Sequence, residues 1–435
     1  MKRWLTALGI LVALGGAGCK SLDAFDAGAL VDGPARAAPG TAERRLLVMV
    51  AEQPVTHYRP GVGAGGGYGA AAGGSQIRTA RALAQAYGFT IVDQWPMPSL
   101  GVRCFVGEVP AGRVPAELVE RLALDPRVES AQSLQVFRVL ARDEAAGSPS
   151  AAPGRSGLDA VHRTATGKGV AVAQIDTGVD VMHPALRARI TETRNFVGGT
   201  RFGPEFHGTA VAGVIVAQTD GDIGGIAPGA SLLTLKACWP SSEAAGAAVC
   251  DSFTLAKALQ YAILRNVRII NLSLGGPRDR LLERLLDKGL ERGITILGAV
   301  DPEAPADTFP AAHPGVIAVA TRWAPDAPAG VVLMPGNDVL TTVPNGRWGL
   351  VSGSSFATAH VSGVAALLLE CSPRLGPGEM AILLRASARR ASADGASAVL
   401  DVCTTLGRAA PAVPCTCCCP RAGPHGGEAS ARRPS

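Results

Sequence analysis

Aromatic side chains are scarce in this chain of 435 residues: Phe, Trp and Tyr together make up only 4% of it. Hydrophobic residues of all kinds make up 47%, so the chain can bury a sizeable core, which aliphatic and small side chains must fill. Charge is also scarce, since charged residues make up 18% and the formal net charge is +5. Without a basic stripe, this composition argues against a nucleic-acid partner.

A hydrophobic run long enough to cross a bilayer is missing at the N-terminus, because the apolar residues 4–14 fall short of the roughly 20 that are needed. The run follows Lys2 and Arg3 and precedes small residues and Cys19. This order is typical of an export signal. Small residues before a cysteine resemble a bacterial lipoprotein cleavage box, which predicts acylation of Cys19 and anchoring in the cell envelope. The alternative is an ordinary signal and a secreted protein.

Ten cysteines in an exported chain can form disulfides. Cys238 and Cys250 bracket a loop rich in Ser, Ala and Gly, and they are the predicted pair. The cysteines crowded between residues 415 and 419 have no histidine at metal-ligand spacing. No loop carries a calcium-ligand pattern either. The sequence therefore predicts no metal and no cofactor.

Two domains with different patterns follow the export signal of residues 1–19 and a linker at 20–43. Residues 44–141 alternate in the order β-α-β-β-α-β, which predicts a small sheet with two helices on one face, the ferredoxin-like plan. A Gly-rich stretch at 61–74 lacks the Lys-Ser/Thr of a phosphate loop and is read as an insertion. Residues 142–156 form a second linker, and the Pro, Cys and Arg-containing tail 409–435 is expected to be disordered.

The second domain, residues 157–408, alternates apolar strands with helical stretches. Such alternation predicts an α/β fold with a parallel sheet covered by helices on both faces. The expected strands are residues 170–175, 231–235, 267–272, 294–300 and 316–320.

Three short motifs fall where such a sheet places chemistry. Asp176 begins Asp-Thr-Gly directly after the first of these strands, and His207 opens a helix of small residues with His-Gly-Thr. Ser355 lies in Gly-Ser-Ser-Phe-Ala at the start of an apolar helix, where a serine alone would be an ordinary N-cap. Together, an Asp, a His and a Ser in this order favour nucleophilic catalysis.

In these motifs, residues 157–408 resemble the subtilisin-like serine peptidase family. That family's Gly-Thr-Ser-Met-Ala aligns with Gly-Ser-Ser-Phe-Ala here and selects Ser355 as the nucleophile. The segment Ser273-Leu274-Gly275 is similar to the family's substrate-binding strand. The resemblance implies a serine endopeptidase acting on extended polypeptide, with His207 as the base and Asp176 orienting it. It also implies that residues 44–141 are a propeptide that assists folding, inhibits the enzyme and is cut off in the linker.

One position departs from the family pattern. The family's side-chain oxyanion donor is an Asn, and Asp301 aligns with it, while no Asn occurs between Leu272 and Gly336. An ionised carboxylate would repel an oxyanion and could donate only when protonated. The alternative hypothesis is therefore a catalytically degenerate peptidase fold that serves as a peptide-binding or interaction module of the envelope.

Overall fold

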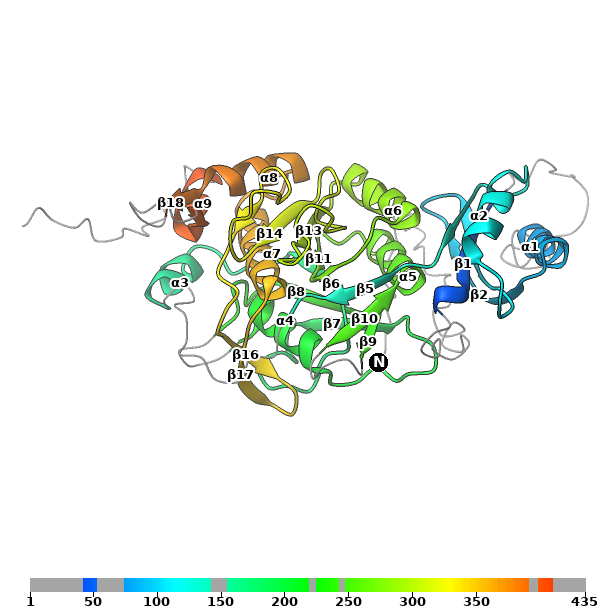
Figure 1. Cartoon of the computed structure of the whole chain (residues 1–435). Coiled ribbons are helices and arrows are strands. Elements are labelled where there is room, and N and C mark those ends of the chain that lie inside the picture. The colour runs from blue at the N-terminus through cyan, green and yellow to red at the C-terminus, as the bar shows by residue number, and fades with distance from the viewer. Residues whose placement is uncertain are drawn as a thin grey trace, which may run out of the picture.

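The computed structural model describes residues 42–52, 74–141, 155–218, 224–241, 247–390 and 398–409. The predicted export signal with Cys19, almost all of the first linker, and the tail lie outside the described residues, as do residues 142–154 of the second linker. Two domains are seen: a smaller N-terminal one, coloured blue to cyan, lies beside a larger C-terminal one (Figure 1).

The N-terminal domain is a four-stranded antiparallel sheet with the strand order β2-β3-β1-β4. Its elements follow a short 3-10 helix and are β1 (Arg45–Ala51), α1 (Gly74–Tyr87), β2 (Thr90–Met97), β3 (Val102–Glu108), α2 (Pro115–Ala123) and β4 (Ser130–Ser133). Alternate residues of β1 face opposite ways. Leu46 and Val48 pack with Leu83 of α1 and Leu122 of α2, whereas Leu47 and Met49 belong to a core shared with the C-terminal domain.

The C-terminal domain is built on a parallel sheet of seven strands, in the order β15-β14-β13-β11-β6-β8-β7. The strands are β6 (Ala171–Asp176), β7 (Ile190–Asn195), β8 (Ser231–Lys236), β11 (Ile269–Leu272), β13 (Thr295–Ala299), β14 (Ile317–Ala320) and β15 (Val332–Leu333). The predicted α/β class and its five strands are confirmed. The sequence pattern missed β7, which is mostly polar and half-buried, and β15, which has two residues.

Helices cover both faces of this sheet (Figure 1). One face packs against α4 (Phe206–Val216) and α7 (Ser354–Cys371), with α3 (Arg155–His162), α8 (Pro377–Ala386) and α9 (Val402–Ala409) around them. The other face packs against α5 (Ser252–Leu264) and α6 (Arg280–Glu291). Two hairpins complete the domain, β16 (Val339–Val343) with β17 (Arg347–Val351) and β18 (Ala388–Arg390) with β19 (Ala398–Leu400). Among the described helices, α7 alone has the length and composition to cross a membrane, and it is 89% buried inside the protein.

A third, small sheet joins the two domains. Its order is β12-β5-β10-β9, from β12 (Leu274–Gly275), β5 (Val136–Val139), β10 (Ala248–Asp251) and β9 (Cys238–Pro240). The chain leaves the N-terminal sheet after β4, and β5 then lies between two strands of the C-terminal domain. A disulfide joins Cys238 to Cys250 across β9 and β10, and so reinforces one side of this sheet.

Candidate active site

The sheet brings Asp176 to its edge as the last residue of β6, with 1% of its surface exposed. Its Oδ1 accepts hydrogen bonds from the backbone N–H of Thr177 at 2.6 Å and from His207 Nδ1 at 2.7 Å. His207 is the second residue of α4 and is equally buried. The next residue must be glycine, because a Cβ on Gly208 would lie 2.7 Å from the Thr177 carbonyl oxygen. A carboxylate bonded to Nδ1 holds the imidazole with Nε2 available as a proton acceptor.

Ser355 lies in the first turn of α7 and is fully buried. Its neighbour Phe356 packs against the His207 ring, with 5.7 Å between ring centroids, so the first turn of α7 contacts the start of α4. In this structure Ser355 Oγ donates to the Ser273 carbonyl at 2.9 Å. Within the described part of the chain, His207 Nε2 is buried without a hydrogen-bond partner.

The end of the N-terminal domain occupies the position beside Ser355. Strand β5 runs antiparallel to both neighbours, pairing Val139 with Leu274 of β12 and Arg138 with Val249 of β10. The next residue, Leu140, donates its N–H to the Ser273 carbonyl at 3.3 Å, and its own carbonyl accepts from Ser355 N at 3.2 Å. The predicted segment Ser273-Leu274-Gly275 therefore pairs with an extended strand of the chain itself, and the Leu140 carbonyl meets the positive end of α7.

Gly353 contacts the backbone of Leu140 and Ala141 at this site. Its φ of 150° is one that side-chain-bearing residues rarely adopt. A Cβ there would also lie 2.4 Å from the Leu140 carbonyl oxygen and 2.8 Å from Ala141 Cα. Only glycine lets the backbone approach the Leu140–Ala141 peptide bond so closely.

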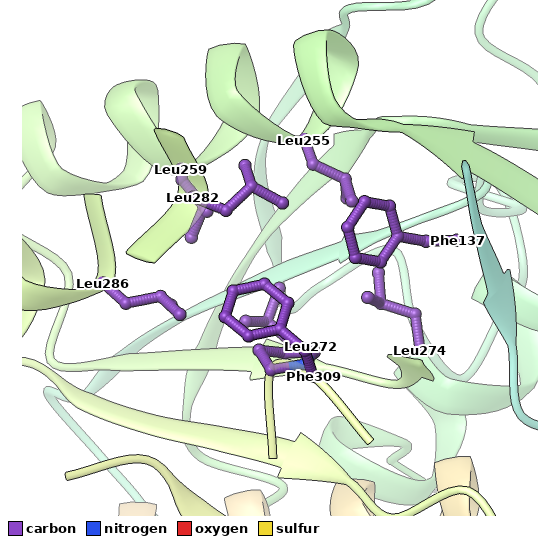
Figure 2. Close-up of a pocket in the computed structure, with 9 residues that line it drawn as sticks. Phe137, Leu255, Leu259, Leu272, Leu274, Leu282, Leu286 and Phe309 are labelled. Atoms are coloured by element: carbon purple, nitrogen blue, oxygen red, sulfur yellow. The ribbon is translucent and has the colours of Figure 1, made fainter. Parts of the chain in front are cut away.

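Two side chains of the bound segment point into the C-terminal domain. Leu140 lies over Gly275, whose added Cβ would be 3.0 Å from Leu140 Cδ1 and 3.5 Å from Thr308 Oγ1. Phe137 is fully buried and packs 6.2 Å from the Phe309 ring. Figure 2 shows the two rings in one pocket with leucines from β11, β12, α5 and α6, namely Leu255, Leu259, Leu272, Leu274, Leu282 and Leu286. The Phe137 ring therefore occupies an apolar pocket, whereas Leu140 lies over Gly275 near Thr308.

Asp301, the residue aligned with the family's Asn, follows β13 by two positions. Its Oδ1 accepts from the Glu303 N–H at 2.9 Å, and its own N–H donates to Thr308 Oγ1 at 2.8 Å. The Asp301 side chain thus caps a turn. Among the described residues, the backbone N–H of Ser355 is the group that donates to the Leu140 carbonyl.

Glu205 and Lys236 were missed by the sequence reasoning. Glu205 precedes His207 by two residues, and its Oε2 accepts from the Gly178 N–H at 2.6 Å, just after Asp176. Its Oε1 pairs with the ammonium of Lys236, a fully buried side chain at the end of β8. The ion pair links the segments that carry Asp176 and His207. A lysine closing the apolar run Ser-Leu-Leu-Thr-Leu-Lys was the available signal.

No group of three or more His, Cys, Asp or Glu side chains that could hold a metal ion occurs in the described ranges.

Comparisons with known proteins agree with this geometry. Residues 167–321 and 322–404 match the model of the Subtilase family. The intracellular serine protease of Paenibacillus polymyxa is 35% identical over 231 residues, which cover 48% of this chain and 69% of that protein. Subtilisin E of Bacillus subtilis (strain 168) is 35% identical over 230 residues, covering 48% of this chain and 57% of its own length.

Among solved structures, the fold is similar to that of fervidolysin from Fervidobacterium pennivorans, a keratinolytic enzyme related to subtilisin. The TM-score is 0.61 at 20% identity, covering 87% of this chain and 64% of fervidolysin, so this likeness concerns the fold alone. The comparisons do not support the alternative of a degenerate peptidase fold. The chain belongs to the subtilase family and is a subtilisin-like serine endopeptidase.

Proposed function

We propose that Asp176, His207 and Ser355 carry the catalysis in this chain. Ser355 Oγ attacks the carbonyl carbon of the scissile bond while His207 Nε2 takes its proton, and Asp176 stabilises the imidazolium. The tetrahedral intermediate then collapses, the C–N bond breaks, and His207 returns the proton to the leaving amine. Water next attacks the acyl-enzyme, with His207 as base, and releases the carboxylate product.

The first substrate is the chain itself, and the bond that is cut joins Leu140 to Ala141. The supporting observation is the hydrogen bond from Ser355 N to the Leu140 carbonyl, because it holds that carbonyl at the helix terminus where an oxyanion is stabilised. The N-terminal domain then acts as the propeptide and stays on the enzyme as its inhibitor, with β5 between β10 and β12.

Other substrates are extended polypeptides that replace β5. Phe137 and Leu140 indicate their side chains: an apolar residue before the cut and a large apolar or aromatic residue three positions earlier. The Phe137 position is an apolar pocket, and the Arg138 side chain, between β10 and β12, is exposed to solvent.

The test compares the full chain with its Ser355→Ala variant. We expect the wild type to release an N-terminal fragment whose mass corresponds to a chain ending at Leu140. It should also react with a fluorophosphonate at Ser355, and the variant should do neither. Equal fragments from both proteins would contradict self-processing. A cut elsewhere in the wild type would contradict the assignment of Leu140–Ala141 and leave the triad intact.

We also propose that the protein is exported and anchored through an acylated Cys19. Lys2, Arg3 and the apolar run before Cys19 support this, and so does the Cys238–Cys250 disulfide, since disulfides persist in oxidising compartments. Expression in a bacterium with a labelled fatty acid tests it, because wild type should take up the label and Cys19→Ser should not. A soluble, unlabelled wild-type protein in the medium would instead indicate secretion.

A further inference from the structure

A second contact between the two domains lies away from β5, at Lys257 on α5. Only 6% of this lysine is exposed, although lysine side chains normally reach solvent. Its ammonium lies 4.5 Å from the centroid of the Phe253 ring on the same helix. The other neighbours come from β2 of the N-terminal domain: Asp93 Oδ2 at 3.6 Å and the Trp95 ring at 5.6 Å. We call these four residues the Lys257 site.

A bulge in β2 directs Asp93 toward this site. The pairing register of β2 with β3 shifts between Ile91 and Asp93, so one residue of β2 is unpaired there. Ile91 packs against the helices of its own domain, and in a regular strand Asp93 would share its face. The extra residue turns Asp93 to the opposite face, together with Trp95 and Met97, which contact the C-terminal domain. The bulge therefore interrupts an otherwise regular strand at Asp93, whose carboxylate pairs with Lys257.

Two further contacts between the domains lie near the Lys257–Asp93 ion pair. Trp95 meets the Phe196 ring edge-on at 6.0 Å between centroids, and Gln260 Nε2 donates to Ser99 Oγ at 2.9 Å. All of these contacts connect β2 and the loop after it with the C-terminal domain, and none involves β5.

Burial of the ammonium is unfavourable unless an anion compensates it. Loss of water lowers the pKa of Lys257, while Asp93 and the buried Asp251 act in the opposite direction. When the N-terminal domain departs, Lys257 regains water and loses Asp93. The carboxylate of Asp93 therefore decides whether covering Lys257 favours or opposes the complex.

We propose that the Lys257 site is an exosite that keeps the cleaved N-terminal domain bound and so sets how long the new enzyme stays inhibited. The inference rests on the proposed self-processing and adds a binding determinant outside the catalytic site. Its occupant is this chain's own Asp93–Trp95 segment. Cutting after Leu140 leaves every contact of the site intact, so the lifetime of the inhibited complex depends on it.

Two substitutions with opposite expectations test the exosite in the full chain after fragment masses have confirmed the cut. Activity on a chromogenic peptide then reports release of the N-terminal domain. Asp93→Asn removes the carboxylate that pairs with the buried ammonium and leaves it only the electrostatic attraction of Asp251, and we expect release about 10- to 100-fold faster. Lys257→Met removes the ammonium and keeps an apolar side chain against Phe253 and Trp95, so release should be no faster than in wild type.

The matched control is Glu129→Gln, which breaks a second ion pair between the domains, Glu129 with Arg284 at 2.7 Å. Because 32% of Glu129 and 30% of Arg284 are exposed, the change should alter release by less than about threefold. Equal release from wild type and Asp93→Asn, or equal effects of Asp93→Asn and Glu129→Gln, would overturn the exosite.

A second measurement separates this inference from the proposed self-processing. The Ser355→Ala chain should stay uncut. In this chain, hydrogen exchange of the β5 backbone amides reports how often the N-terminal domain dissociates from the C-terminal domain. Asp93→Asn should raise that exchange by about the same 10- to 100-fold, and Glu129→Gln should not. Failure of the wild type to cut itself refutes self-processing, whereas unchanged exchange in Asp93→Asn refutes the exosite.

Discussion

Replacing Gly276 by alanine tests whether the pocket that holds Phe137 also selects substrates. A Cβ at this position would lie 2.5 Å from Phe137 Cδ1 and 3.0 Å from its Cγ, well inside contact distance. Neither partner can move away easily. The ring is enclosed by Phe309 and several leucines, and Gly276 exchanges two backbone hydrogen bonds with Phe309, at 2.9 and 3.1 Å. The aromatic side chain must therefore leave the pocket.

The expected magnitude follows from the area that is lost. Burying a phenylalanine side chain contributes about 1.5–3 kcal/mol. Losing it lowers kcat/KM by about 10- to 150-fold for a peptide with Phe three positions before the leucine at the cut. A peptide with Ala at that position should differ between the two enzymes by less than about threefold, because it never filled the pocket.

The assay is kcat/KM for this pair of peptides with the wild type and with Gly276→Ala, each freed of its N-terminal domain. Thermal unfolding serves as the control for folding. An equal loss for both peptides would indicate general damage to β12. An unchanged value for the Phe peptide would refute the claim that substrates bind as β5 does.

Three other predictions concern single groups. Asp301→Asn keeps the oxygen that accepts the hydrogen bond from the Glu303 N–H and adds an N–H₂ donor, so kcat should rise by about tenfold or more. An unchanged kcat would show that the side chain at position 301 does not contact the oxyanion. Glu205→Gln leaves Lys236 buried without its anion and should therefore lower kcat. The same change should lower the free energy of unfolding, measured by urea titration, by about 3 kcal/mol. The double variant Glu205→Gln with Lys236→Met should recover most of that free energy, because it no longer buries an unpaired ammonium. Burial lowers the pKa of His360 from 6.5 to about 4, so its protonation favours the unfolded chain. Stability should therefore be full above pH 6.5 and fall by up to about 3 kcal/mol as the pH drops toward 4, and His360→Asn should flatten that part of the pH profile.

The parallel sheet and the positions of the proposed triad were accessible from the sequence because each depends on local patterns. Asp176 follows an apolar strand, and His207 and Ser355 open apolar helices, so the fold class alone places them at one edge of the sheet. The location of β5 was not accessible. The last apolar run of the N-terminal domain, which ends near Leu140, reads as that domain's last strand. Only the distant partners Leu274 and Val249 show that β5 belongs to another sheet.

The exosite illustrates a second limit. Periodicity places Asp93 on the face of Ile91, and the bulge that reverses this has no composition signal in β2. Lys257 likewise looks like a solvent-facing helix residue until a second domain covers it. Interactions between domains depend on register and docking, which a single chain's local pattern does not encode.

We expect the departure at Asp301 to affect the two proposed reactions, self-cleavage and the cleavage of other chains, unequally. Self-cleavage is a single turnover on a peptide bond that the fold already holds beside Ser355. Such positioning lowers the activation free energy by a large amount. Cleavage of other chains has no such advantage and depends more on oxyanion stabilisation. Asp301→Asn should therefore accelerate turnover of added peptides while leaving the extent of self-cleavage unchanged. If both reactions gained equally, the positioning of Leu140 would not be what makes self-cleavage efficient.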